Sequence, residues 1–267
     1  MIYEQKCQDW EEFEKAIQVL FENTKQHRKR SASVVSEPMF RGIADETWGL
    51  KTTLERYSAK TFKLVDYFSI MRGVLPALES HTGKRWKLED YDPKAESGPT
   101  PPAGYPLMIY LRHHGFPSPF LDWTLSPYVA AFFAFRPQLT GVSENVAIYS
   151  YIEYVGDVKG WSDIQPAVFG VGRYVATDRR HHVQQCQYTF AKRKDGEDYV
   201  YCEHEAAFQQ AKFSLHDLVN KYLIPRSERG KVLEKLHFMN INAYSLFSDE
   251  ETLMEELAYQ EIGRREL

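Results

Sequence analysis

Residues 122–135 read DWTLSPYVAAFFAF and end in an almost wholly apolar run. Ser126 is a suitable helix N-cap and Pro127 is a preferred first helical residue, so a helix is expected to begin there. Because nearly all of its side chains are apolar, this helix should be buried on most of its surface. It is therefore expected to form part of the core, with Asp122, Trp123 and Thr124 at its entrance.

The segments on either side mix strand and helix patterns without a regular alternation. An N-cap at Asp9 with Glu12 three residues later predicts a helix near the start of the chain. An Asp-Gly pair within residues 194–197, between runs at 188–193 and 199–204, predicts a β-hairpin. Further strands are expected at residues 39–43, 146–154 and 222–225, and further helices at residues 54–68, 67–78, 107–114, 214–220, 227–238 and 248–260. This order favours an α+β fold, with a mixed or antiparallel central sheet and flanking helices, over a doubly wound sheet.

The chain is expected to form one main domain with an additional helix. Residues 1–37 are interpreted as an N-terminal helix that packs on the core, and residues 38–267 as the main domain. Residues 91–105 are rich in Pro, Gly, Ser and charge, and a segment of this length is long for a loop in a compact domain. We interpret it as an irregular insertion, either a lid or an excursion from the core.

The composition excludes several classes of protein. The chain has 267 residues, 43% hydrophobic and 26% charged, which is too apolar and too evenly charged for disorder. It has no apolar run long enough to cross a bilayer, and it does not begin with a secretory signal. Its three cysteines give no disulfide framework and suggest a reducing compartment. A net charge of −4 argues against nucleic-acid binding through bulk charge. We expect a soluble, cytoplasmic protein without a membrane partner.

The first candidate site is the Phe40-Arg41-Gly42 triplet on the strand expected at residues 39–43. An arginine on a short apolar strand is unfavourable to bury without an anionic partner. Its planar guanidinium suits two-point binding of a phosphate or carboxylate, and Gly42 allows a ligand or a backbone segment to approach closely. Two interpretations stay open: Arg41 binds an anionic ligand, or it pairs with a buried acid such as Asp122 as internal scaffolding.

The second candidate site is residues 113–124, in which Gly and Pro residues precede Asp122, Trp123 and Thr124. The entrance of a buried helix faces the positive end of the helix dipole, which favours an anion or an active-site carboxylate. Trp123 offers a flat ring for stacking but also fits a core position. We interpret Asp122 and His114 as functional. The alternative is that Asp122 and Thr124 only satisfy free N–H groups.

The third candidate site is residues 178–189, where Arg, His and Gln side chains precede the predicted hairpin. Side chains alternate between the faces of a strand, so Gln185, Gln187 and Thr189 share one face if the strand begins there. A solvated basic loop is the alternative. Cys186 lies near arginines and histidines that would favour a nucleophilic thiolate, although a small buried cysteine is the commoner case. The His and Cys spacing is not that of a zinc site, and no phosphate-binding, dinucleotide-binding or hydrolase motif is present.

Taken in this order, the three groups resemble the FRG domain, a family named after its Phe-Arg-Gly motif. The family's second block is similar to residues 113–127 with the apolar helix that follows, its third block to residues 179–189, and its closing segment to residues 240–249. Two positions depart from the pattern: Pro119 replaces a commonly basic residue, and Cys186-Gln187 replaces a Gln-Gly pair. The resemblance spans roughly residues 40–257 and implies a bacterial or phage protein.

The layout also resembles that of ADP-ribosyltransferase folds, by analogy at the level of the fold. The resemblance implies that Arg41 holds the NAD diphosphate, that Asp122 and Thr124 frame the nicotinamide pocket, and that Gln185 takes the late position. An amide cannot act as a carboxylate base, so a glutamate on the next strand, Glu203 or Glu205, would supply that charge. The remaining residues of the nucleotide site would be Phe40, Gly42, His114, Trp123 and Arg179.

The resemblance therefore implies a polar cleft for a phosphate-bearing nucleotide, with NAD as a substrate of ADP-ribosyl transfer or glycohydrolysis and no tightly bound cofactor. A protein or a nucleic acid would be the acceptor. Two other classes stay open. The cleft could belong to a binding module that senses a nucleotide or peptide without turnover. Alternatively, the chain is a nucleic-acid-directed toxin or phage-defence effector that uses the basic runs at residues 28–30, 179–180 and 192–194, with binding that weakens steeply with salt.

Overall fold

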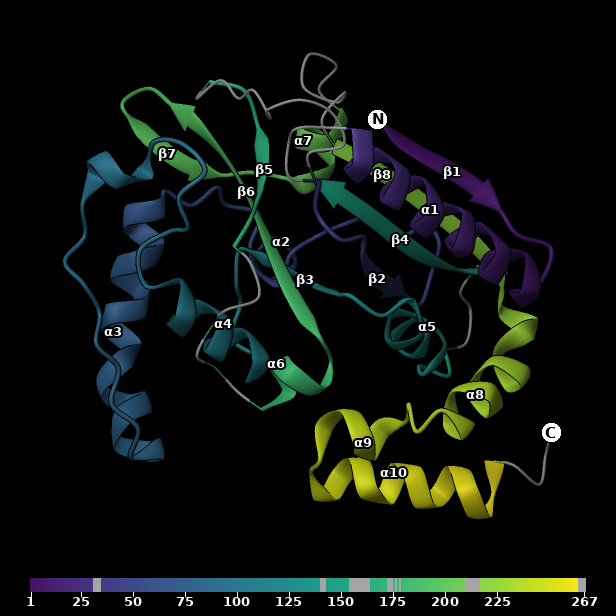
Figure 1. The fold of residues 1–267 in the computed structure, drawn as a ribbon. Coiled ribbons are helices and arrows are strands. Elements are labelled where there is room, and N and C mark those ends of the chain that lie inside the picture. Colours follow the sequence, from purple (N-terminus) through teal and green to yellow (C-terminus); the bar gives the residue numbers. More distant parts are fainter. Residues whose placement is uncertain are drawn as a thin grey trace.

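The structure is a computed structural model, and it describes residues 1–30, 35–139, 143–153, 164–171, 175, 177, 179–209 and 217–263. Figure 1 shows how helices surround the strands. The strands are β1 (Ile2–Lys6), β2 (Met39–Ile43), β3 (Phe120–Thr124), β4 (Asn145–Glu153), β5 (Ala167–Gly170), β6 (Cys186–Asp195), β7 (Asp198–Tyr201) and β8 (Asp217–Pro225). The α-helices are α1 (Trp10–Arg30), α2 (Thr53–Tyr57), α3 (Leu64–Thr82), α4 (Tyr105–His113), α5 (Pro127–Phe135), α6 (Arg180–Val183), α7 (His204–Gln209), α8 (Arg229–Phe238), α9 (Ala243–Phe247) and α10 (Glu250–Glu261), and the short 3-10 helices are η1 (Pro93–Glu96) and η2 (Arg226–Glu228).

The strands form one sheet in the order β1-β8-β4-β2-β3-β6-β5, with β7 paired to β6. β1 runs parallel to β8, whereas the other strand pairings of the described residues are antiparallel. The fold is therefore α+β with a mixed central sheet and flanking helices, which confirms the fold class predicted from the sequence. Within the described part of the chain, none of the helices is long and apolar enough to cross a membrane.

The apolar helix α5 lies in the core, as its composition predicts. Its N-terminus is capped by Ser126, whose Oγ accepts a hydrogen bond from the Val129 N–H at 3.2 Å, and Pro127 occupies its first turn. α1 begins in the predicted way, with Asp9 Oδ1 accepting from the Glu12 N–H at 2.8 Å. Apolar side chains of α1, α5 and α8 pack together against β4 and β8. A second core cluster joins α3 and α4 to β3 and β6, and a third joins α7 to β4 and β8.

Helix α5 approaches β2 closely at Gly42. A Cβ added at Gly42 would lie 1.8 Å from the carbonyl oxygen of Ala130 and 2.8 Å from the backbone nitrogen of Ala134. Real Cβ atoms do not come so near to backbone atoms, so the contact requires glycine at this position. Of the two partners that the sequence allows for Gly42, a ligand or a backbone segment, the structure places the backbone of α5 there.

The strands β2 and β3 are neighbours in the sheet but pair at a single position, Phe40 with Thr124. By contrast, β2 pairs with β4 over five residues, and β3 with β6 over five. Beyond the Phe40 position the two strands are no longer paired, and the Arg41 side chain bridges them: its Nη1 donates to the carbonyl oxygen of Asp122 at 2.7 Å. This interruption of the ladder leaves room for side chains and a cavity near the middle of the sheet.

Residues 91–105 contain η1 and are tied to the sheet by a buried lysine. Lys192 of β6 donates to the carbonyl oxygen of Glu96, and its ammonium lies 5.4–5.5 Å from the ring centres of Phe169, Phe190 and Tyr199. Burial raises the pKa of the Glu96 carboxyl to about 7. Lys192 is therefore not an exposed member of the basic run at residues 192–194, which weakens that run as a surface for nucleic acid.

Several predicted elements differ from the structure, and the strands β1, β3 and β5 lie in segments where the sequence pattern predicts no strand. The helix predicted at 214–220 is wrong over residues 217–220, which belong to β8 and pair with β4 and β1. One helix predicted at 54–68 is two, because α2 ends at Tyr57, Ser58 is extended, and α3 begins at Leu64. The helix predicted from residue 248 begins two residues later, at Glu250, because Ser248 is left-handed (φ 58°) and Asp249 is the N-cap of α10. Residues 154, 178 and 214–216 of the predicted segments lie outside the described residues.

Candidate functional site

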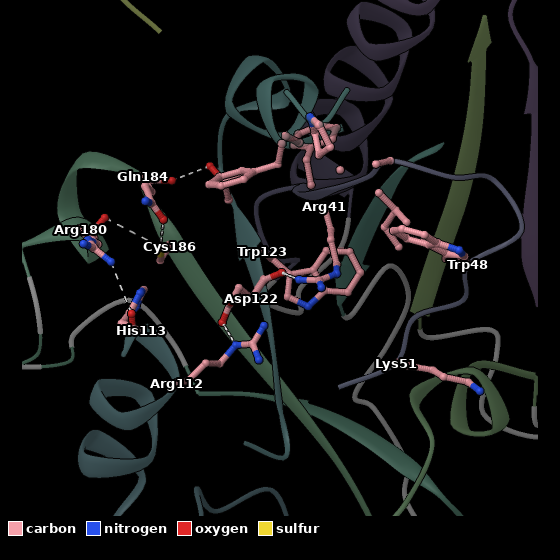
Figure 2. Close-up of a pocket in the computed structure, with 18 of the residues that line it drawn as sticks. Arg41, Trp48, Lys51, Arg112, His113, Asp122, Trp123, Arg180, Gln184 and Cys186 are labelled. Atoms are coloured by element: carbon pink, nitrogen blue, oxygen red, sulfur yellow. Dashed lines mark hydrogen bonds and ion pairs between the residues drawn. The ribbon is translucent and has the colours of Figure 1, made fainter. Parts of the chain in front are cut away.

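A cavity of about 860 Å³ lies where β2 and β3 are unpaired. Its walls come from both strands, from the segment between β2 and α2, and from α4, α5, α6 and α9. Figure 2 shows Arg41, Asp122 and Trp123 near its middle. His113, Arg180, Gln184 and Cys186 lie to one side of them, and Trp48 and Lys51 lie to the other. The cavity thus gathers residues from four parts of the chain that are far apart in sequence.

The cavity is strongly cationic, although the chain as a whole carries a formal charge of −4. The basic residues that line it are Arg41, Lys51, Arg56, Arg112 and Arg180. Among the described lining residues Asp122 is the one acid. A concave site with this excess of one charge attracts ions of the opposite sign.

Arg41 holds a half-buried positive charge in this cavity. Its Nη1 donates to the Asp122 carbonyl rather than to a carboxylate, and its Nε is buried without a hydrogen-bond partner. Burial lowers the pKa of the guanidinium to about 10, and the nearby charges of Arg112 and Arg56 act in the same direction. The group is still protonated at neutral pH, so the repulsion among these arginines persists there.

Asp122 is paired with Arg112 of α4, not with Arg41. Arg112 Nε donates to Asp122 Oδ1, and Arg112 Nη1 donates to Thr53 Oγ1 at 2.8 Å. The Asp122 side chain is 34% exposed, whereas that of Arg112 is 6% exposed. Burial would raise the pKa of the Asp122 carboxyl. The charge and hydrogen bond of Arg112 outweigh this effect and hold the pKa below its ordinary value, and the nearby His113 and Arg41 act in the same direction. Asp122 is therefore an ionised carboxylate that faces the cavity.

In the third block, the residues that reach the cavity are neighbours of those chosen from the sequence. Gln185 is exposed, has φ 51° and is not part of the cavity lining, because β6 begins only at Cys186. Gln184 lines the cavity instead, and its carbonyl accepts from Thr124 Oγ1 at 2.7 Å. Likewise, Arg179 is exposed outside the lining, while Arg180 lines it and pairs with Asp249 at 2.8 Å.

The two histidines of the second block are separated in the same way. His114 is exposed, lies outside the lining, and packs against Tyr110 with ring centres 4.3 Å apart and ring planes tilted by 42°. His113 lines the cavity, and its Nε2 is 2.7 Å from the hydroxyl of Tyr188. The helix α4 turns one histidine toward the sheet and leaves the other at the surface.

The two aromatic residues expected in the nucleotide site, Phe40 and Trp123, are largely core residues. Phe40 is fully buried and packs against Phe21, and Trp123 is 2% exposed. Trp123 Nε1 donates to Thr189 Oγ1 at 2.8 Å, which in turn contacts His204 Nε2 at 3.1 Å. Both residues therefore shape the cavity wall from within the core.

Several other candidates do not supply chemistry to the cavity. Cys186 lines it but is buried, and burial raises the pKa of its thiol to about 12, which favours the alternative of a small buried cysteine over a thiolate nucleophile. Glu205 Oε1 accepts from the Leu50 N–H at 2.9 Å and belongs to the support of the loop before α2. Glu203 is exposed and not part of the lining. Among the described residues, no group of three or more His, Cys, Asp or Glu could hold a metal ion.

Sequence reasoning did not choose several residues that line the cavity. Arg180 and Gln184 lie inside the third block, and the others lie outside the three blocks: Trp48, Lys51, Arg56 and Arg112. Arg180 and Gln184 are direct neighbours of the chosen Arg179 and Gln185, so a one-residue uncertainty in where a strand or helix begins explains their omission. Trp48, Lys51 and Arg56 follow β2 in an irregular segment, where no periodic pattern shows which side chains point to the cavity.

Comparison with known proteins gives one match. Residues 36–141 match the family model described as the FRG domain. That range contains the first two sequence blocks and most of the cationic lining, while the third block and the closing segment lie beyond it. No curated protein and no solved structure matches the chain significantly.

Proposed function

We propose that this chain, which carries an FRG domain, uses the cationic cavity to bind a phosphate-bearing nucleotide. Its unbalanced charge carries the proposal: five basic residues and one acid line a cavity in a chain of net charge −4. Arg112 is paired with Asp122, and Arg180 with Asp249. Within the part of the chain that the structure describes, Arg41, Lys51 and Arg56 form no ion pair, so three positive charges are available to an anion.

The chemistry of Arg41 favours a phosphate group as that anion. A buried N–H without an acceptor is unfavourable, and the Nε of Arg41 is such a group. A phosphate oxygen placed beside it would accept a charge-assisted hydrogen bond and reduce the repulsion with Arg112 and Arg56. The guanidinium is planar and offers several donors, which suits the oxygens of a phosphate group.

The size of the cavity favours a nucleotide over an inorganic ion. Small-molecule sites are typically about 300–1,000 Å³, and this cavity measures about 860 Å³. A lone phosphate would leave most of that space to water. A mononucleotide or dinucleotide would fill it, place its phosphates beside Arg41, and extend its nucleoside portion toward one side of the cavity.

Titration calorimetry with ADP and NAD tests this binding. Arg41→Ala is expected to weaken ADP binding about 10- to 100-fold, the effect of losing one or two charge-assisted hydrogen bonds. Arg41→Lys should fall between the two, because it keeps the charge but loses the planar fork. Lys60→Ala removes an exposed lysine that is not part of the cavity lining and serves as the control. Unchanged ADP binding by a folded Arg41→Ala protein would rule out the phosphate clamp.

A second candidate, NAD-dependent ADP-ribosyl transfer or glycohydrolysis, is favoured by one observation: Asp122 is ionised, about one-third exposed, and faces the cavity beside Arg41. In this reaction the bond between the ribose C1 and the nicotinamide nitrogen breaks, and its electron pair leaves with nicotinamide. The Asp122 carboxylate would stabilise the positive charge on the ribose. Water or a nucleophile of a protein or nucleic acid would then form the new bond to C1 and release a proton.

The reaction is tested by incubating the protein with NAD and analysing both by mass spectrometry. We expect nicotinamide release, with either free ADP-ribose or an added ADP-ribose mass on the protein. Asp122→Asn should abolish release while NAD still binds. Equal release by Asp122→Asn and wild type would exclude this role for Asp122. Saturable binding with NAD returned intact would favour the alternative of a nucleotide-sensing module.

A further inference from the structure

Trp48 is a large exposed ring at the edge of the cavity. Its indole is 49% exposed and belongs to the cavity lining, and in Figure 2 it lies on the side opposite Arg180 and His113. Two other rings of the lining already contact protein groups: Trp123 is buried, and the guanidinium carbon of Arg180 lies 5.3 Å from the ring centre of Phe247. Among the described residues, no aromatic or cationic side chain stacks on Trp48. One indole face is therefore available to a ligand.

The loop that carries Trp48 is held in place on its N-terminal side. The buried carboxylate of Asp45 accepts from the Thr47 N–H at 2.8 Å and from the Thr47 hydroxyl at 2.7 Å. It also accepts from the N–H of Ser143 at 3.0 Å and from its hydroxyl at 2.9 Å. The Trp48 N–H itself donates to the Asp45 carbonyl at 3.1 Å. These bonds fix the backbone from which the indole projects.

The loop is held on its C-terminal side as well. The Leu50 N–H donates to Glu205 Oε1 at 2.9 Å, and a Cβ at Gly49 would lie 2.6 Å from the same oxygen. The glycine thus permits the carboxylate to reach the loop backbone. Because both flanks of Trp48 are anchored, its exposed position is part of the folded structure, and a ligand would meet the ring with little loss of conformational entropy.

We infer that Trp48 is the stacking platform for the planar ring of the ligand, so that the cavity selects phosphate compounds with a heterocyclic base over those without one. The inference rests on the proposed function and adds the chemical class of the substrate. Lys51 follows three residues later and also lines the cavity, so a flat ring and a positive charge stand close together along the chain. A purine or pyridine nucleotide presents the matching pair, a π-face and a phosphate.

Base–aromatic stacking is typically worth a factor of about five to one hundred in affinity when the ring is removed. We therefore propose calorimetric titration of ADP, ribose 5-phosphate and pyrophosphate into wild type, Trp48→Ala and Trp48→Phe. The control is Phe238→Ala, which removes an exposed ring (72%) that is not part of the cavity lining. Circular dichroism spectra establish that each variant is folded.

We expect Trp48→Ala to weaken ADP binding about five- to one-hundred-fold and to change pyrophosphate binding less than twofold. Trp48→Phe should retain most of the affinity for ADP, and Phe238→Ala all of it. An equal loss for ADP and pyrophosphate, or no loss for either, would overturn the stacking role, while binding of pyrophosphate to wild type would still support the phosphate site. If none of the three compounds binds wild type, the proposed function itself fails, and the stacking role fails with it.

Discussion

Replacing Gly42 by alanine tests the packing that forms the cavity. The added Cβ would lie 1.8 Å from the Ala130 carbonyl oxygen and 2.8 Å from the Ala134 nitrogen. Both atoms belong to the backbone of α5, so no side-chain rotation can relieve the clash, and the helix must move away from β2. Overpacking of a core typically costs about 1–3 kcal/mol, and a clash with a helix backbone lies at the upper end. We expect a loss of about 3 kcal/mol or more, which lowers Tm by about 6–12 °C.

Urea unfolding followed by circular dichroism measures this loss, and Gly73→Ala is a matched control. Gly73 lies in α3, and a Cβ there would meet nothing within 4 Å. Alanine is favoured over glycine in a helix by about 1 kcal/mol, so Gly73→Ala should stabilise the protein slightly. If the free energy of unfolding of Gly42→Ala lies within about 0.5 kcal/mol of that of wild type, the close contact between α5 and β2 does not require glycine at this position.

The remaining predictions concern the cavity charge and two buried titratable groups. Lys51→Ala should weaken ADP binding about two- to fivefold, and Lys60→Ala should not, in the same calorimetric titration; equal effects would place the anion elsewhere. Burial raises the pKa of Glu96 to about 7 from an ordinary 4.5. The stability that the protonated carboxyl contributes is therefore fully present below pH 4.5 and is lost as the pH rises through 7. Measured by urea unfolding, the free energy of unfolding of Glu96→Gln relative to wild type should therefore rise by about 1 kcal/mol from pH 5 to pH 8, allowing for solvent screening. A difference that does not change with pH would contradict this. Burial lowers the pKa of His204 to about 3 from an ordinary 6.5, so the stability that the neutral imidazole contributes is present above pH 6.5 and is lost as the pH falls. In urea unfolding, the free energy of unfolding of wild type should fall by about 2 kcal/mol between pH 7 and pH 5 from this group, and that of His204→Gln should fall by less. An equal fall in both proteins would contradict the burial of a neutral histidine.

The parts of the fold that sequence predicts are those fixed by local chemistry. Ser126 and Asp9 cap their helices as expected, because an N-cap depends on a few neighbouring residues. The Asp-Gly turn joins β6 and β7 as expected, with Gly196 at φ 64°. By contrast, the sequence pattern predicts a helix where β8 begins. Its residues are strand because β4 and β1 lie on either side of it, and that pairing depends on distant parts of the chain.

The candidate site was predictable in outline for the same reason. The motif at residues 40–42 and the acid at residue 122 both reach the cavity. The first lies on a strand that the sequence predicts, and the second lies at the predicted entrance of the apolar helix. The choice between Gln184 and Gln185 depended on where β6 begins, and one residue of error changes which side chain reaches the site. That Arg112, and not Arg41, would pair with Asp122 could not be inferred, since it depends on how α4 lies against β3.

A crystal structure of the protein with ADP would test the central claim most directly, because it shows where the phosphates lie. The account predicts phosphate oxygens within hydrogen-bond distance of the Arg41 guanidinium, with the adenine ring stacked on Trp48. ADP bound outside the cavity, or an empty cavity in crystals grown with saturating ADP, would contradict it.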